Sequence, residues 1–131
     1  MILETSFVID LLRGNPRALA KARELDGRGE ATYLPTPVLF ELWEGVARSV
    51  RVRRSRRLLE DFIKAQDLLP FASEDAREAG FLSGNLKKQG RPMGTVDVQL
   101  AGMAKAREET LLTGDRDFSA VSRLVSLEGY P

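Results

Sequence analysis

Residues 2–12 read ILETSFVIDLL, and this stretch contains the unit from which the fold can be predicted. An apolar run that ends at Leu3 suits a buried strand, and the acid Glu4 follows it directly. Thr5 or Ser6 can then cap the apolar-periodic helix that comes next. The stretch therefore predicts a strand that passes through an acid into a helix.

The same unit recurs along the rest of the chain. The apolar runs ATYLP, DLLPF and ETLLT are further predicted strands. Amphipathic periodicity predicts further helices over residues 16–26, 38–50, 52–65, 73–88 and 96–107. Because parallel strands need crossover connections, this alternation predicts an α/β fold, a three-layer α/β/α sandwich with a central parallel sheet of four or five short strands.

Local signals also predict how two of these helices begin and which side one of them buries. Thr36 and Thr95 are the expected N-caps of the helices over 38–50 and 96–107. Three apolar residues at helical spacing mark the expected inward side of the first of these helices: Phe40, Trp43 and Ala47.

The composition limits both the class of protein and its chemistry. A chain of 131 residues, 43% hydrophobic and 30% charged, suits one domain spanning residues 1–131. Apolar runs are short and no basic leader precedes one, so a soluble cytoplasmic protein without a membrane span is expected. The absence of Cys and His excludes disulfides, thiolate sites and a histidine base, which leaves carboxylates, hydroxyls, Lys and Arg for any catalysis.

The positive charge is concentrated in one block. Residues 48–57 read RSVRVRRSRR and contain six Arg and no acid, although the net charge of the whole chain is only +1. Two interpretations stay open: a solvated helix face paired with nearby acids, or a patch that contacts phosphate groups. The candidate phosphate contacts are Arg53, Arg54, Arg56 and Arg57.

Acidic residues follow the predicted strands or begin the helices after them: Glu4, Glu41, Asp97, Asp115 and Asp117. The carboxyl ends of parallel strands share one edge of a sheet, so these acids are expected in one crevice. Clustered carboxylates repel one another, and a hard divalent cation such as Mg²⁺ or Mn²⁺ would neutralise them. Each acid alone also has a structural explanation, as a dipole-complementing or turn residue, so the pattern leaves both roles open.

Four stretches stand in order along the chain: ILETSFVIDLL at 2–12, FELWEG at 40–45, GRPMGTVDVQLAGMA at 90–104 and LLTGDRDF at 111–118. Together they resemble the motifs of PIN-domain ribonucleases, the VapC-like toxins of type II toxin–antitoxin systems. ILETSFVIDLL is similar to the family's opening, in which an acid ends the first strand and Thr-Ser or Thr-Asn follows. FELWEG at 40–45 resembles its ELxxG helix motif, and GRPMGTVDVQLAGMA at 90–104 resembles G(R)PxGxxDxxIAA. LLTGDRDF at 111–118 resembles the closing LLTxDxDF motif.

The resemblance implies a Mg²⁺- or Mn²⁺-dependent endoribonuclease that hydrolyses RNA phosphodiesters at an acidic site. It also implies a homodimer and a small VapB-like antitoxin protein that blocks the crevice, often with an Arg. The implied catalytic acids are Glu4, Glu41, Asp97, Asp115 and Asp117, the first four of them as metal ligands. Thr113 and Ser6 would orient carboxylates or water through their hydroxyls.

One position departs from the family pattern. The family usually has Asp where this chain has Glu4, and the extra methylene displaces the carboxylate by about one C–C bond. Mg²⁺ requires near-ideal octahedral geometry at roughly 2.0–2.1 Å. The alternative function is therefore a catalytically weakened PIN module that binds antitoxin or RNA without efficient cleavage.

Overall fold

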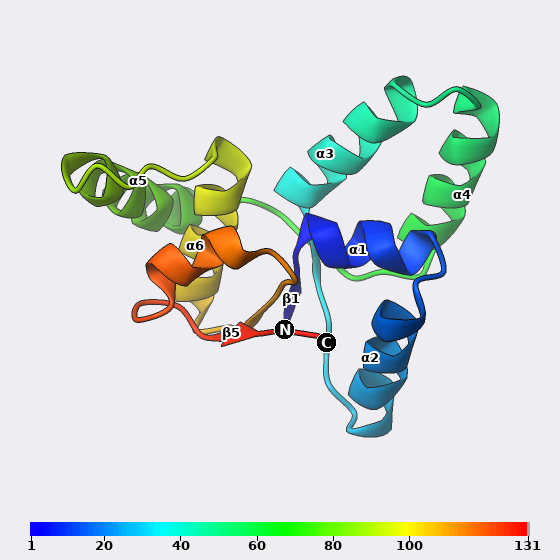
Figure 1. The fold of residues 1–131 in the computed structure, drawn as a ribbon, viewed down its shortest axis with the longest axis horizontal. Helices are drawn as coiled ribbons and strands as arrows, with labels where there is room; N and C mark the ends of the chain where they lie inside the picture. The colour runs from blue at the N-terminus through cyan, green and yellow to red at the C-terminus, as the bar shows by residue number, and fades with distance from the viewer. Residues whose placement is uncertain (131) are drawn as a thin grey trace.

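A parallel sheet of very short strands lies at the centre of the computed structural model, which describes residues 1–130 (Figure 1). The strands are β1 (Ile2–Leu3), β2 (Leu34–Pro35), β3 (Leu68–Leu69), β4 (Leu111–Leu112) and β5 (Leu127–Glu128). A bridge between Ile2 and Tyr33 joins the two hydrogen-bonded groups of strands, so the order is β3-β2-β1-β4-β5. The predicted α/β fold with a parallel sheet is confirmed, and β5 is a strand that was not identified in the sequence.

The predicted helices are all present. They are α1 (Thr5–Leu12), α2 (Pro16–Gly27), α3 (Thr36–Ala47), α4 (Val52–Lys64), α5 (Ser73–Lys88) and α6 (Thr95–Arg107), and a short 3-10 helix follows β4 (Arg116–Val121). Figure 1 shows the α3–α4 pair and the α5–α6 pair on opposite sides of the point where β1 passes into α1. Across residues 1–130, no helix combines the length and apolarity needed to cross a membrane.

The core is built from the strands and from the helix faces that cover them. Ile2, Leu111 and Leu112 in the central strands are inaccessible to solvent, as are Val8 of α1 and Leu100 of α6. Full burial of one such side chain stabilises the native state by roughly 1.5–3 kcal/mol. The site at the carboxyl ends of β1 and β4 therefore rests on the most deeply buried part of the chain.

Helices α5 and α6 pack unusually closely. A Cβ atom on Gly102 of α6 would lie 2.6 Å from the backbone nitrogen and the Cβ of Ala79 in α5. Real Cβ atoms do not approach backbone this closely, so only glycine fits at this point of α6. The close contact fixes α6, which carries Asp97, relative to α5.

Three expected N-caps are wrong. Glu4 caps α1 in place of Thr5 or Ser6, because its extended backbone lets its carboxylate accept a 2.9 Å hydrogen bond from the Ser6 amide. Thr36 and Thr95 are instead the first residues of α3 and α6, since Pro35 and Gly94 already have the backbone conformation that precedes a helix. The Thr36 hydroxyl accepts a hydrogen bond from the Phe71 amide at 3.1 Å instead.

The expected inward side of α3 is also wrong. Phe40 is 62% exposed and Trp43 is 37% exposed, whereas Val38 and Leu42 are buried. Ala47 lies on the exposed side as well. The helix carries apolar residues on two sides, and periodicity alone does not tell which side faces the sheet. Large aromatic side chains are consequently left on the surface.

Candidate metal centre

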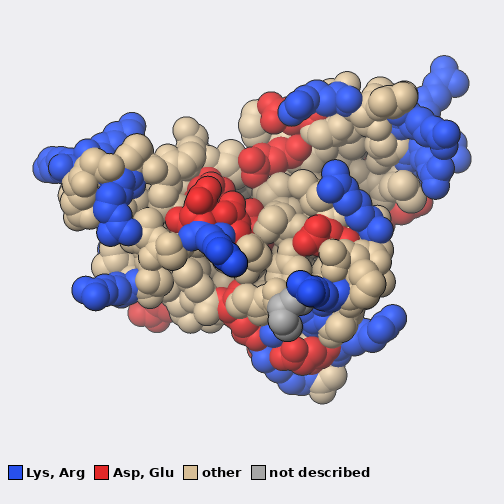
Figure 2. Space-filling view, viewed as in Figure 1, with Lys and Arg blue, Asp and Glu red and all other residues tan. Residues whose placement is uncertain are grey.

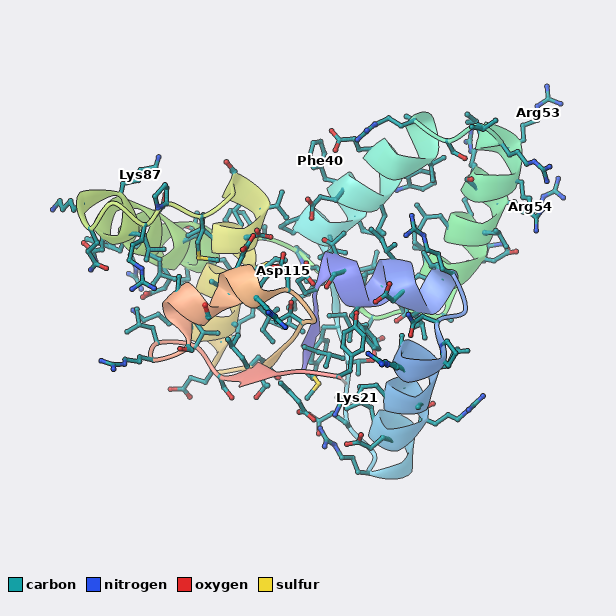
Figure 3. All side chains as sticks on the ribbon, viewed as in Figure 1. Lys21, Phe40, Arg53, Arg54, Lys87 and Asp115 are labelled. Carbon is teal, nitrogen blue, oxygen red and sulfur yellow. The ribbon has the colours of Figure 1, made fainter. Side chains whose placement is uncertain are left out.

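Three aspartates converge beyond the carboxyl ends of β1 and β4. Asp115 and Asp117 follow β4, and Asp97 lies in the first turn of α6. One carboxylate oxygen from each lies within 4.8 Å of the other two. Figure 2 shows acidic side chains gathered in the middle of one face, and Figure 3 places Asp115 there, between the α3–α4 and α5–α6 pairs. The structure thus brings together three of the five acids named from the sequence into one tight group.

Glu4 lies beside this group and is held by hydrogen bonds. Its side chain is almost fully buried, and its Oε2 accepts hydrogen bonds from the amide and the hydroxyl of Ser6 and from the Thr113 hydroxyl at 3.0 Å. Burial raises the pKa of Glu4, while the hydrogen bonds from Ser6 and Thr113 oppose that rise and the charge of Asp115 adds to it. All these hydrogen bonds go to Oε2, so Oε1 is the oxygen with capacity for a cation.

A continuous chain of hydrogen bonds leads from Glu4 to Asp117. The Thr113 hydroxyl donates to Glu4 and accepts from the Asp115 amide at 2.9 Å. Asp115 Oδ1 in turn accepts from the Asp117 amide, also at 2.9 Å. These bonds fix the position of the segment after β4 relative to the start of α1.

Glu41 reaches the site from α3. The Thr5 hydroxyl donates to Glu41 Oε1 at 2.5 Å, which connects the first turn of α1 to α3. Glu4 and Glu41 both lie outside the tight group of three aspartates. The role of Thr5 was missed in the sequence, where Thr5 was interpreted only as a possible cap; its place directly after Glu4 was the available signal.

Asp97 lies close to the four other acids of the site, and its protonation is affected by burial and by their charges. The pKa of Asp97 is raised to about 6, first by burial and then by the charges of Glu4, Asp115, Glu41 and Asp117 in that order. Within residues 1–130, no Lys or Arg forms an ion pair with any of these five carboxylates. Closely spaced carboxylate oxygens without a protein counter-charge fit a hard divalent cation.

The Arg block lies away from the acids. Figure 3 shows Arg53 and Arg54 on α4 projecting outward, on the side opposite to Asp115. Arg56 forms an exposed ion pair with Glu60 at 2.8 Å, and Arg57 is also on the surface. The structure therefore does not bring the four candidate RNA contacts to the acidic group.

The chain is similar to known proteins over nearly its whole length. Residues 1–124 match the PIN domain. The chain is 27% identical to the tRNA(fMet)-specific endonuclease VapC of Shigella flexneri, over 94% of this chain and 92% of the relative. It is 30% identical to ribonuclease VapC19 of Mycobacterium tuberculosis, over 86% of each chain.

Solved structures show the same fold. The chain matches a crystal structure of VapBC2 from Rickettsia felis bound to a promoter DNA fragment, with a TM-score of 0.88 and 23% identity, over 99% of this chain and 98% of that chain. It matches DNA-bound VapBC from Salmonella typhimurium with a TM-score of 0.86 and 23% identity, over 98% and 96% of the two chains. Both likenesses concern the fold.

Proposed function

The chain belongs to the PIN-domain family, and from this premise we propose that it is a metal-dependent endoribonuclease, the toxin of a toxin–antitoxin pair. The observation that carries the proposal is the convergence of Asp97, Asp115 and Asp117 within 4.8 Å of one another, without a protein counter-charge among residues 1–130. The names of the relatives, an endonuclease and ribonucleases, support RNA as the substrate.

In this proposal the three aspartates hold the cation, and Glu4 and Glu41 complete the acidic set from either side. A bound Mg²⁺ or Mn²⁺ would lower the pKa of a water and stabilise the charge that develops on the phosphate. Ser6 and Thr113 hold Glu4 through its Oε2. The other oxygen, Oε1, is therefore kept in one orientation for binding the cation. Hydrolysis of an RNA phosphodiester by water would leave a 3′-hydroxyl and a 5′-phosphate.

The test is cleavage of total RNA by the purified chain in Mg²⁺ or Mn²⁺, with and without EDTA. Cleavage that needs the metal and stops with EDTA supports the nuclease. The second candidate function is a weakened PIN module that binds RNA or antitoxin, and Glu4 is the observation that favours it. RNA binding without cleavage in either metal would establish the second function.

A groove between α1, α3 and α4 supports a proteinaceous antitoxin of the VapB kind as the partner. Its volume is about 370 Å³, and its apolar lining is formed by Ile9, Leu12, Leu42, Val46, Leu58 and Leu59. Leu12 and Leu58 are exposed, which leaves apolar surface available for a bound segment. Glu41 also lines the groove, so an antitoxin segment bound there would reach the edge of the acidic group. An Arg of that segment would neutralise the negative charge of the acids.

Leu58→Gln is expected to weaken binding of a VapB-like antitoxin at least about tenfold, which corresponds to roughly 1.4 kcal/mol. Leu58 is 54% exposed, so a polar side chain of similar size is tolerated in the free protein. Titration calorimetry measures the affinity, and RNA cleavage is expected to stay unchanged. Leu68→Gln, at a 46% exposed leucine of β3 outside the groove, is the matched control. Equal affinities of the two variants would contradict this location of the antitoxin.

Arg53 and Arg54 are proposed to contact RNA phosphates at a distance from the cleaved bond. Replacing both by Gln is expected to weaken RNA binding and to reduce the salt slope by about 0.7 for each lost contact with single-stranded RNA. Binding titrations at several salt concentrations measure the slope. Arg17→Gln with Arg23→Gln removes two exposed charges from α2 and is the control. If the salt dependence of RNA binding keeps the parent slope, the Arg block is a solvated surface that does not contact RNA.

Exposed aromatic side chains support the proposed homodimer. Phe40 and Trp43 of α3 and Phe81 of α5 are large apolar residues on helices that flank the acidic face. Phe40 and Trp43 are three residues apart and so share one face of α3, and a continuous apolar patch of this kind often marks an interaction site. Sedimentation equilibrium would measure the molar mass, and a monomer at micromolar concentration would contradict the homodimer.

A further inference from the structure

Tyr130 contacts two separate segments of the chain. Its hydroxyl donates a 2.6 Å hydrogen bond to Asp10 Oδ2 in α1. Its ring meets the Phe7 ring edge-on, with centroids 5.1 Å apart and an interplanar angle of 73°. The ring also lies over Gly114, where an added Cβ would be 3.0 Å from Cε1, Cζ and the hydroxyl oxygen of Tyr130.

These two segments are the ones that deliver the acids of β1 and β4. Phe7 and Asp10 belong to α1, the helix that Glu4 caps. Gly114 stands directly before Asp115, in the turn after β4. The ring and hydroxyl of Tyr130 therefore hold the start of α1 and the turn after β4 together from the outside, while the hydrogen bond from Thr113 to Glu4 holds them from within.

We propose that Tyr130 is a positioning residue that sets the separation of Glu4 and Asp115, and through it the affinity of the acidic site for its divalent cation. The proposal rests on the function proposed above. Tyr130 does not itself reach the cation, because its hydroxyl is committed to Asp10.

Two further observations fit this role. The pKa of Tyr130 is raised to about 12, first by burial and then by the hydrogen bond to Asp10, so the hydroxyl is a permanent donor at neutral pH. Gly114 leaves no spare room: any side chain there displaces either the Tyr130 ring or the turn that carries Asp115. The contact therefore has one geometry, as a positioning contact needs.

The experiment compares Mn²⁺ affinity, measured by titration calorimetry, with kcat and KM for RNA cleavage, at a temperature where every variant is folded. Tyr130→Ala is expected to weaken Mn²⁺ binding on the order of tenfold and to lower kcat, with KM for RNA unchanged, since partners that orient metal ligands typically contribute about 10–100-fold. Tyr130→Phe keeps the ring and is expected to retain most of the affinity. Gly114→Ala places a Cβ too close to the Tyr130 ring and so displaces the same contact without removing the ring. It is expected to weaken Mn²⁺ binding as well.

Two controls separate positioning from general stability and from failure of the metal site. Leu25→Ala removes a buried side chain of α2, a helix that carries none of the five acids, and is expected to lower Tm without changing Mn²⁺ affinity. If Tyr130→Ala and Gly114→Ala bind Mn²⁺ like the parent while Asp97→Asn binds it more weakly, this proposal alone is overturned. If the parent and Asp97→Asn have the same Mn²⁺ affinity, the metal site is overturned and this proposal with it.

Discussion

Asp97→Asn is expected to lower metal-dependent RNA cleavage by at least about 10²-fold, as when one fixed charge-stabilising group is removed from an active site. Asp97 is the member of the tight aspartate group that α6 supplies, and the close packing of Gly102 on Ala79 holds that helix in place. The measurement is kcat/KM in saturating Mn²⁺. Asp26→Asn removes an exposed carboxylate from α2 and is expected to cleave like the parent. If Asp97→Asn also cleaves like the parent, the acidic-site assignment is wrong.

The same variant is expected to be more stable than the parent at pH 7 without metal. The pKa of Asp97 is raised from 3.8 to about 6, so between these values the native state binds more protons than the unfolded state. The free energy of unfolding therefore falls as pH rises through this window, and the neutral Asn avoids that loss. Urea unfolding at pH 4 and at pH 7 measures it. If the free energy of unfolding depends on pH in the same way for parent and variant, the raised pKa of Asp97 is contradicted.

Glu4→Asp is expected to raise Mg²⁺-supported cleavage by about tenfold or more, because a misplacement of about 1 Å can cost on the order of 10²-fold in rate. Asp is also among the best N-caps, so α1 keeps its cap and the fold is expected to persist. The gain in Mn²⁺ should be smaller, since Mn²⁺ is larger and softer than Mg²⁺ and tolerates irregular coordination better. Initial rates in each metal provide the measurement.

The matched control for this change is Glu41→Asp, which also removes one methylene from a carboxylate of the site. The family motif has Glu at this position, and Thr5 holds the Glu41 carboxylate at its present length. Glu41→Asp is therefore expected to leave the Mg²⁺ rate unchanged or lower it. An unchanged or lower rate for Glu4→Asp would mean that the crevice has adapted to Glu4, whose carboxylate already accepts hydrogen bonds from Ser6 and Thr113.

Features that depend on neighbouring residues could be predicted from the sequence. The helix over Ser73–Lys88 begins and ends where the acids of its first turn and the lysines of its last turn indicate. The acids after β1 and β4 follow from the rule that parallel strands end at one edge of the sheet. Both kinds of signal come from neighbouring residues. Because the strands are parallel, these local signals also predict which acids lie close together in space.

Features that depend on distant partners could not be predicted. The α3 helix has two apolar sides, and the preference for burying Val38 and Leu42 over Phe40 and Trp43 depends on what α1 and the sheet present to it. The hydrogen bond of Tyr130 with Asp10 joins residues 120 positions apart, and no spacing in the sequence indicates it. The bond from Thr5 to Glu41 also joins separate segments, and the place of Thr5 directly after Glu4 was the only sign of it in the sequence.

The hydrogen bond between Thr113 and Glu4 joins residues that are 109 positions apart, and β1 pairs with β4 over the same distance. A chain growing on the ribosome has therefore made Glu4 and Glu41 long before Asp115 and Asp117 exist. Contacts of such long range also form slowly, because a large loop must close first. A nascent chain consequently carries no assembled acidic group until the residues after β4 have been synthesised and β4 has paired with β1.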